Sequence, residues 1–266
     1  MLLADYGMTR PAEAMPKAKA AALAALKLDA GLAEAHTSLA LLTAVYEWRW
    51  EQAGRHFRRA LELNPGSAQA HHWYGYDCLG PQGKLDQALA EVETALQLDP
   101  LSMIIRSSLG ALFLTRREYD RAIAHSQHSL RLDPQFYKTY TILGRAYFLK
   151  AQYEEAIQCF EKARALSSGA HYLLGGLGQS YAMAGQKAKA RKALRELLAL
   201  GKRNYVPALS VAMIHAGLGD LDSAFQWLDQ AYRNHEGNLV YLNVYPAYDC
   251  LRPDPRFQAL VAKVGL

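Results

Sequence analysis

Histidine pairs are the residues of this chain best suited to hold a metal ion. His125 and His128 are spaced for one face of a helix, and His71 and His72 are adjacent. Two such ligands bind a metal weakly, whereas a tight site takes three or four ligands with ordered partners of their own. No carboxylate or cysteine stands at ligand spacing beside His125. The sequence therefore predicts no metal site and no cofactor, and core packing is the prediction for His36 and His71.

Two further patterns could serve catalysis. The glycine-rich run 175–178 follows no strand, whereas a phosphate-cradling loop needs a strand, a turn and a helix N-terminus in succession. Glu154 and Glu155, like Asp220 and Asp222, stand where helices begin. Acidic groups there favour the positive end of the helix dipole, and general acid–base work is the alternative interpretation. No serine-hydrolase, zinc-protease or kinase motif is present, so we predict no enzymatic activity.

Composition indicates a folded protein, with 51% apolar and 21% charged residues among 266. The net charge is +5, and its densest cluster, at 187–192, opens one helix. A solvated helix face is the first interpretation and a nucleic-acid patch the alternative, but no nucleic-acid-binding motif accompanies the cluster. The sequence thus predicts no nucleic-acid partner.

The cysteines indicate a reducing compartment. Cys78, Cys159 and Cys250 are odd in number and widely spaced, so free thiols are expected. The first eight residues include Asp5 and no basic segment, which argues against a signal peptide. No apolar run reaches the length of a membrane span. We expect a cytoplasmic protein without membrane contact.

An internal repeat positions all of these residues. Ala122, Ala156, Ala190 and Ala224 are each 34 residues apart. Upstream, alanines at 18, 53 and 88 continue the series at steps of 35, 35 and 34. A second series of mostly small residues runs seven positions later, and prolines at 65, 100 and 134 mark helix ends. Three markers in one phase indicate repeated helix pairs that stack on their neighbours.

Two repeats carry an L-G-x-x-Y signature in their first helix, Leu143-Gly144 with Tyr147 and Leu177-Gly178 with Tyr181, and two others carry weaker copies. In the best copy, Ala156 and Phe160 follow. This pattern resembles the tetratricopeptide repeat (TPR), although the tryptophan that often opens the first helix is absent from every copy. The resemblance implies an all-α solenoid, a right-handed superhelix of antiparallel helix pairs. It covers nearly the whole chain.

The expected organisation is a single domain over 1–266. A partial repeat spans 1–32, with a helix over 12–28, and a capping segment spans 239–266, with an apolar stripe after Asp254-Pro255. The first two full repeats are one residue longer, and we expect the extra residue in the turn between their helices. The chain start resembles the end of a helix whose beginning is missing, so a fragment of a longer protein is expected. Full repeats are predicted at 33–67, 68–102, 103–136, 137–170, 171–204 and 205–238.

Two tracts, 48–74 and 254–266, resemble TPR segments that lie C-terminal to signalling domains of bacterial regulators. By resemblance, the first helix of each repeat lines a concave groove. Chaperone-binding TPR proteins hold two carboxylates with a clamp of lysine and asparagine side chains. This chain has Thr37, Leu41 and Trp73 at clamp positions, so we do not expect it to bind the C-terminal peptide of a heat-shock chaperone. Packing between repeats is the alternative role for any one groove residue. The predicted partner-binding residues are His72, Tyr76, Lys138, Arg145, Phe148, Tyr172 and Gln179.

The leading functional hypothesis is a scaffold that binds a protein or peptide in this groove, within a bacterial regulatory system. The alternative is a ligand-sensing regulatory domain that binds a small molecule. Leu23 and Leu26 of the 12–28 helix lack a full covering neighbour, so we also expect self-association through the N-terminal end.

Overall fold

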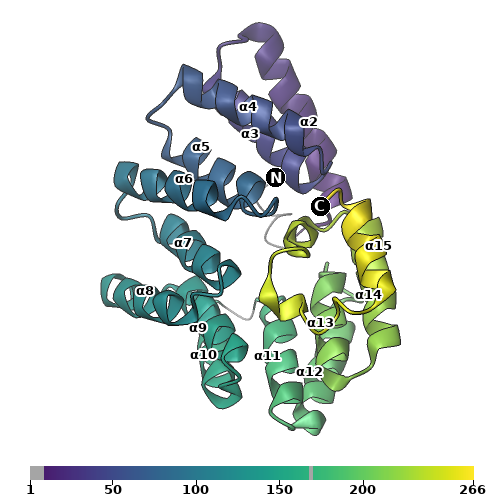
Figure 1. Ribbon diagram of the computed structural model, residues 1–266. Coiled ribbons are helices and arrows are strands. Elements are labelled where there is room, and N and C mark those ends of the chain that lie inside the picture. Colours follow the sequence, from purple (N-terminus) through teal and green to yellow (C-terminus); the bar gives the residue numbers. More distant parts are fainter. Residues whose placement is uncertain (1–8, 168–169) are drawn as a thin grey trace. The chain divides into compact units, whose positions relative to one another are not determined.

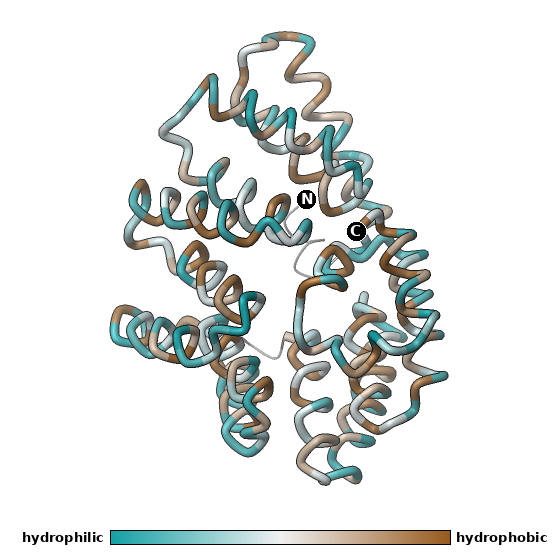
Figure 2. Tube along the Cα trace, viewed as in Figure 1, coloured by the Kyte–Doolittle hydropathy of each residue, from teal (hydrophilic) through white to brown (hydrophobic). Residues whose placement is uncertain are grey.

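The computed structural model describes residues 9–167 and 170–266, and every regular element in these ranges is a helix (Figure 1). The predicted all-α class with antiparallel helix pairs is therefore confirmed. The expected remnant of a helix at the chain start lies outside the described residues. Figure 2 shows hydrophobic and hydrophilic residues interleaved along the helices, as amphipathic packing requires.

The helices follow one another in pairs, each pair being one repeat. A single helix, α2 (Pro11–Leu28), precedes them. The first helix of the second pair is divided into α5 (Ala68–Trp73) and the π-helix η1 (Tyr74–Leu79) and is followed by α6 (Leu85–Leu98). The other pairs are α3 (Ala33–Val45) with α4 (Trp50–Leu63), α7 (Met103–Thr115) with α8 (Tyr119–Leu132), α9 (Tyr137–Leu149) with α10 (Tyr153–Leu166), α11 (Leu173–Met183) with α12 (Lys187–Leu200), and α13 (Ala208–Leu218) with α14 (Leu221–Arg233).

After the pairs come two short 3₁₀ helices, η2 (Gly237–Tyr241) and η3 (Pro246–Tyr248), and a final helix, α15 (Pro255–Lys263). The chain divides into two compact units. The first comprises the described residues up to Leu112 with Asn234–Val244 and Leu260–Leu266; the second comprises those of Phe113–Arg233 with Tyr245–Ala259. The single domain over 1–266 stays a prediction.

Small residues mark the places where paired helices touch. The recurring alanine of the second helix is fully buried in every full repeat, at 53, 88, 122, 156, 190 and 224. On the facing helix, a Cβ at Gly144 would lie 3.1 Å from the Phe160 ring, and one at Gly75 only 2.7 Å from the Ala88 carbonyl. Larger side chains would force the backbones apart, so the 34-residue period records the crossing points of helices.

The turn inside each pair contains one residue with left-handed backbone, again at the repeat period. Gly83, Gly185 and Gly219 have φ of 73°, 75° and 82°, and the equivalent non-glycine residues are Trp48, Arg117 and Ala151. The next N–H in five of the six turns bonds a carbonyl five residues back, as Gln152 does to Tyr147 at 2.9 Å. This Schellman-type ending satisfies the last carbonyls of the first helix and reverses the chain.

A polar side chain at the fourth position of the first helix closes the turn between repeats. His36, His71, Arg106 and Tyr140 each donate to, or share a hydrogen bond with, a carbonyl six residues upstream, at 2.7–3.2 Å. The prediction of core packing for His36 and His71 is therefore wrong, because both rings are only half-buried and serve a hydrogen bond. Gln258 makes the same bond to Arg252 at 3.3 Å in the final helix.

The extra residue of the second repeat lies in a helix, contrary to the expected turn insertion. Residues 74–79 form a π-helix, in which the Gly80 N–H bonds the Gly75 carbonyl five residues back at 2.9 Å. A π-turn takes in one more residue than an α-turn without breaking the helix. The close contact of Gly75 with α6 fixes the start of this wider turn.

The final helix packs on the last pair, which confirms the predicted cap. Within the second unit, the Arg256 guanidinium donates to Asp222 at 2.8 Å and lies 4.2 Å from the centre of the Phe225 ring. Phe257 is fully buried. The Arg256 N–H donates to the Asp254 carboxylate at 2.9 Å, so this residue caps the helix start as expected.

Exchanging residues at the left-handed turn position should change stability in opposite directions. Ala151→Gly relieves the cost of positive φ and should stabilise the fold by about 0.5–1 kcal/mol. Gly185→Ala should destabilise it by about 1 kcal/mol, and its new Cβ would meet no atom within 4 Å, so packing is unchanged. Urea midpoints of the two variants and the parent measure this. Equal shifts of one sign would contradict it.

Candidate functional site

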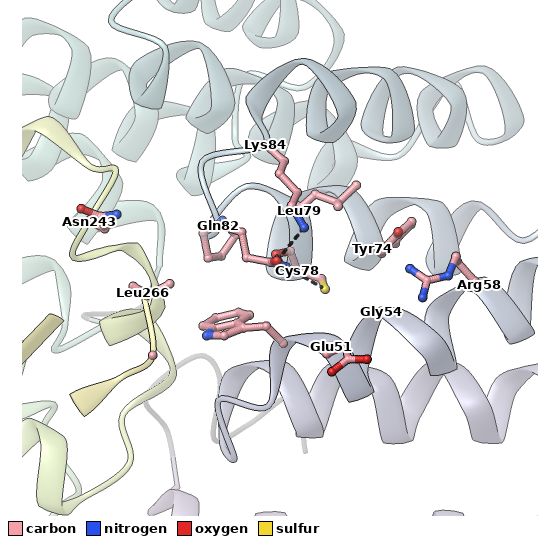
Figure 3. Close-up of a pocket in the computed structure, with 13 residues that line it drawn as sticks. Glu51, Gly54, Arg58, Tyr74, Cys78, Leu79, Gln82, Lys84, Asn243 and Leu266 are labelled. Atoms are coloured by element: carbon pink, nitrogen blue, oxygen red, sulfur yellow. Dashed lines mark hydrogen bonds between the residues drawn. The ribbon is translucent and has the colours of Figure 1, made fainter. Parts of the chain in front are cut away.

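A pocket of about 470 Å³ lies in the first unit, between α4, η1 and the C-terminal residues (Figure 3). Helix α4 contributes one face, the π-helix and its following turn a second, and the C-terminal segment a third. The lining residues are Trp50, Glu51, Gly54, Arg58, Tyr74, Cys78, Leu79, Pro81, Gln82, Lys84, Asn243, Gly265 and Leu266.

Backbone features open this pocket. The π-helix presents Tyr74, Cys78 and Leu79 to it, and π-turns often occur at functional sites. On α4, a Cβ at Gly54 would lie 3.3 Å from an Arg58 guanidinium nitrogen, so the missing side chain lets the guanidinium lie back along its own helix. The third wall is fixed by a hydrogen bond from the Trp50 indole N–H to the Val264 carbonyl at 3.2 Å.

Charged groups of both signs line the pocket. Arg58 and Lys84 line it, and Lys84 donates to the Gln82 amide oxygen at 2.8 Å. Among the described lining residues, Glu51 is the single carboxylate side chain, and Arg55 donates to it at 2.6 Å. Arg55 therefore offsets the charge of Glu51.

Cys78 lies in this pocket as a neutral thiol. Burial raises its pKa to about 12, although the charges of Lys84 and Arg58 act in the opposite direction. Gln82 donates to the Cys78 carbonyl at 2.6 Å, which fixes the amide over the thiol (Figure 3). A thiol with so high a pKa is a poor nucleophile at neutral pH, so the residue serves packing.

The two predicted binding residues of the first unit lie on the second repeat. His72 is buried and shares a 2.8 Å hydrogen bond with Ser108. Tyr76 is half-buried, and its ring lies 6.1 Å from that of His72. The chain's own Tyr241 covers Tyr76, with ring centres 5.3 Å apart and a hydrogen bond from its hydroxyl to the Tyr76 carbonyl at 2.9 Å.

The five predicted residues of the second unit lie on α9 and α11 or at their starts. Lys138, Arg145, Phe148 and Tyr172 are half-buried, and Gln179 is buried. The Arg145 guanidinium lies 5.7 Å from the centre of the Tyr245 ring. The Phe148 ring lies 5.7 Å from that of Tyr153, centre to centre. The Tyr172 hydroxyl donates to the Tyr137 hydroxyl at 3.1 Å. Gln179 packs on Gly217, where an added Cβ would lie 3.2 Å from the Gln179 side chain.

None of the seven predicted residues lines the pocket, because the prediction was restricted to groove positions of the first helices. Arg58 and Gly54 belong to a second helix, and Asn243 lies far along the chain. The available signal was the one-residue insertion before Pro81, which we placed in a turn. Had we interpreted this insertion as a widened helix, it would have indicated Tyr74 and Cys78 as candidate site residues.

The histidine pair considered for metal binding has structural partners. The His125 ring packs edge-on against Phe113, with centres 5.7 Å apart, and His128 accepts a hydrogen bond from Arg131 at 2.9 Å. Within the part of the chain that the structure describes, no three metal-ligating side chains converge. Nor does any helix described there combine the length and hydropathy that crossing a membrane requires.

Comparison with known proteins gives matches to family models and to solved structures. Models described as tetratricopeptide repeat match residues 81–135, 137–170 and 176–200. The structure of PilW, a widely conserved type IV pilus biogenesis factor, aligns at a TM-score of 0.60 and 22% identity over 76% of this chain and 91% of that one. A tetratricopeptide repeat protein from Parabacteroides merdae aligns at 0.63 and 14% identity, over 95% and 93%.

The Cut9–Hcn1 complex of the APC/C aligns at a TM-score of 0.65 and 16% identity, over 98% of this chain and 47% of that one. Identities this low establish the fold alone. A search of curated protein sequences finds no match.

The thiol of Cys78 should resist alkylation in the folded chain. At pH 8, iodoacetamide should modify Cys250 well before Cys78: burial raises the pKa of both thiols, that of Cys78 to about 12, but Cys250 is exposed to the reagent whereas Cys78 is buried. The raised pKa also stabilises the fold fully below about pH 9 and progressively less towards pH 12. Mass spectrometry with and without urea measures the labelling. Equal labelling of both cysteines in the folded chain would refute the assignment.

Proposed function

This chain is a tetratricopeptide-repeat protein, and on that premise we propose that it is a non-catalytic scaffold that binds a partner protein or peptide along the first helices of its repeats. Repeats of this kind expose a long surface whose residues recur at fixed spacing, which suits an extended ligand. The proposed contacts are the half-buried members of the predicted set: Tyr76 in the first unit, and Lys138, Arg145, Phe148 and Tyr172 in the second.

The observation that carries the proposal is where the chain's own C-terminal segment lies. In the first unit Tyr241 packs on Tyr76, and in the second unit Tyr245 lies beside Arg145. These contacts are a tilted pair of aromatic rings and a cation–π approach, which peptide partners also use. A peptide with tyrosine or another aromatic residue could make the same contacts. His72 and Gln179 are buried and are left out of the proposed surface.

The wider context stays a prediction. The resemblance to TPR segments of bacterial regulators supports a regulatory role, and three free cysteines agree with a cytoplasmic location. A ligand-sensing domain is the second candidate function, because the pocket of about 470 Å³ in the first unit falls within the size range of small-molecule sites.

Partner binding is tested with Tyr76→Ala and Arg145→Ala. A partner is first captured from the native host, and its affinity for each variant is then measured by calorimetry. Each substitution should weaken binding at least about fivefold, as removal of an interface anchor does. Arg195→Ala is the matched control, since Arg195 is exposed on α12, the second helix of its pair. If all three variants bind like the parent, the binding surface lies elsewhere.

We also propose self-association through α2. Leu23 is 41% and Leu28 90% exposed near the end of this helix, and exposed leucines on one helix favour contact with another apolar surface. Sedimentation equilibrium should show concentration-dependent dimers that Leu23→Ser with Leu28→Ser abolishes. Leu101→Ser, at a site 81% exposed outside α2, should leave them intact. A parent chain that stays monomeric at the highest concentration would exclude the proposal.

A further inference from the structure

We propose that the exposed face of α12 binds an acidic segment of a partner protein. This face belongs to the second helix of its pair, so it is separate from the first-helix surface proposed above. We call it the α12 basic face, and it comprises the exposed cations of the helix and of the turn that follows: Lys187, Lys189, Arg191, Lys192, Arg195, Lys202 and Arg203.

The α12 basic face holds the whole positive excess of the chain. Residues 187–203 contain seven lysines and arginines and one carboxylate, Glu196, so their side chains sum to +6. The entire chain has 30 lysines and arginines against 25 aspartates and glutamates, which gives +5. All remaining side chains therefore sum to −1. A charge concentrated on one helix in this way attracts a partner of opposite sign.

Carboxylates on this helix and on α14 are already engaged. Glu196 pairs with Arg164 of α10. On α14, Asp222 and Asp229 each pair with an arginine at 2.8 Å. In the part of the chain that the structure describes, none of the seven cations of the α12 basic face forms an ion pair. The cations are therefore available to carboxylates from another molecule.

The cations also lie where they destabilise their own helix. The first turn of every other second helix holds a carboxylate, which suits the positive end of the helix dipole: Glu51, Asp86, Asp120, Glu154 with Glu155, and Asp222.

The first turn of α12 holds Lys187 and Lys189 and no acidic residue. Arg191 follows Lys187 by four residues and precedes Arg195 by four, and like charges at this spacing repel each other on a helix. Local stability given up in this way is typical of a functional site, where a bound partner supplies the compensating interaction.

The neighbouring helix favours a narrow partner over nucleic acid. The pair of Arg164 with Glu196 joins α10 to α12, and α10 exposes Glu154, Glu155 and Glu161. A nucleic-acid duplex is wider than one α-helix and would meet these carboxylates, whereas a peptide chain can follow α12 alone. Helix α12 also contains no aromatic residue on which an unpaired base could stack.

The buried side of α12 argues against a membrane surface. Ala190, Ala193 and Leu197 are buried, whereas a helix that lies in a membrane interface inserts its apolar side into the lipid. Among the cations, Leu198 is 38% exposed. An acidic segment with an occasional apolar residue would match both features, because its carboxylates pair with the cations and its apolar side chain packs on Leu198.

Fluorescence anisotropy with a labelled peptide of four Glu-Glu-Leu repeats tests the inference on the full chain. We expect saturable binding that weakens as sodium chloride is raised, because salt screens exposed charge pairs. A peptide of four Gln-Gln-Leu repeats keeps the length and the apolar residues and should bind at least about tenfold more weakly. Tighter binding of a short DNA duplex, or of phosphatidylserine vesicles, than of the acidic peptide would overturn the proposal.

Lys187→Glu gives two readouts of opposite sign. It should weaken the acidic peptide at least about tenfold, because it places a like charge opposite the ligand. It should also raise the urea midpoint of unfolding, because a carboxylate in the first turn suits the helix dipole. Lys17→Glu is the matched control, since it makes the same change of net charge at an exposed lysine of α2. Its peptide affinity should stay within about twofold of the parent.

Two arginine variants separate this surface from the first-helix surface. Arg195→Ala should weaken the acidic peptide about twofold to fivefold and leave the first-helix partner unaffected, and Arg145→Ala should do the reverse. Absence of peptide binding, or equal losses in Lys187→Glu and Lys17→Glu, would overturn this inference and leave the first-helix proposal standing.

Discussion

The close approach of paired helices at small residues is the constraint on which the structure depends. At Ala156 and its equivalents no surface is exposed, and at Gly144 a Cβ would lie only 3.1 Å from the facing Phe160 ring, so that ring would have to shift. Interiors packed this densely tolerate little added volume, so each crossing point fixes the distance between two helices and the angle at which they meet. Because the crossing points recur every 34 or 35 residues, the same geometry is repeated along the chain.

The turn between the two helices of a pair is a second feature that recurs in each repeat, and the second repeat departs from the pattern. The left-handed residue reverses the chain at the same place in each repeat, and only half of the six positions carry the glycine that suits it. The second repeat departs from this regularity before the turn, where one additional residue widens the helix into a π-turn. That departure brings Tyr74 and Cys78 into the pocket wall opposite α4. The irregular turn of the second repeat thus forms part of a pocket wall in the first unit.

The C-terminal segment changes how the predicted groove is understood. Residues that we expected to face a partner are partly engaged by the chain itself, at Tyr76 in the first unit and at Arg145 in the second. Such contacts do not remove these side chains from a binding role, since a partner can replace one aromatic ring by another. They do mean that a partner must compete with a segment of high effective concentration. His235, stacked on Trp48 with ring centres 4.7 Å apart, fixes the same segment further along the first unit.

The sequence by itself determined the all-helical fold, the repeat period and the helix ends. Ala156, Gly144 and Pro134 act through contacts within one helix pair or its adjoining turn, so their spacing in the chain is enough to reveal them. It also determined the capping helix, whose Asp254 and Phe257 act locally. What it could not determine are contacts between residues far apart in sequence, such as Tyr241 with Tyr76 or Trp50 with Val264.

The burial of His72 and Gln179 likewise depends on neighbouring repeats, through Ser108 and Gly217. The pocket required both kinds of information: a π-turn, whose local signal of one extra residue also fits a longer loop, and a C-terminal wall that only the folded chain brings to it. Packing that recurs in each helix pair appears in the sequence as a regular residue spacing. Contacts between distant segments leave no such pattern, so the tertiary structure alone decided them.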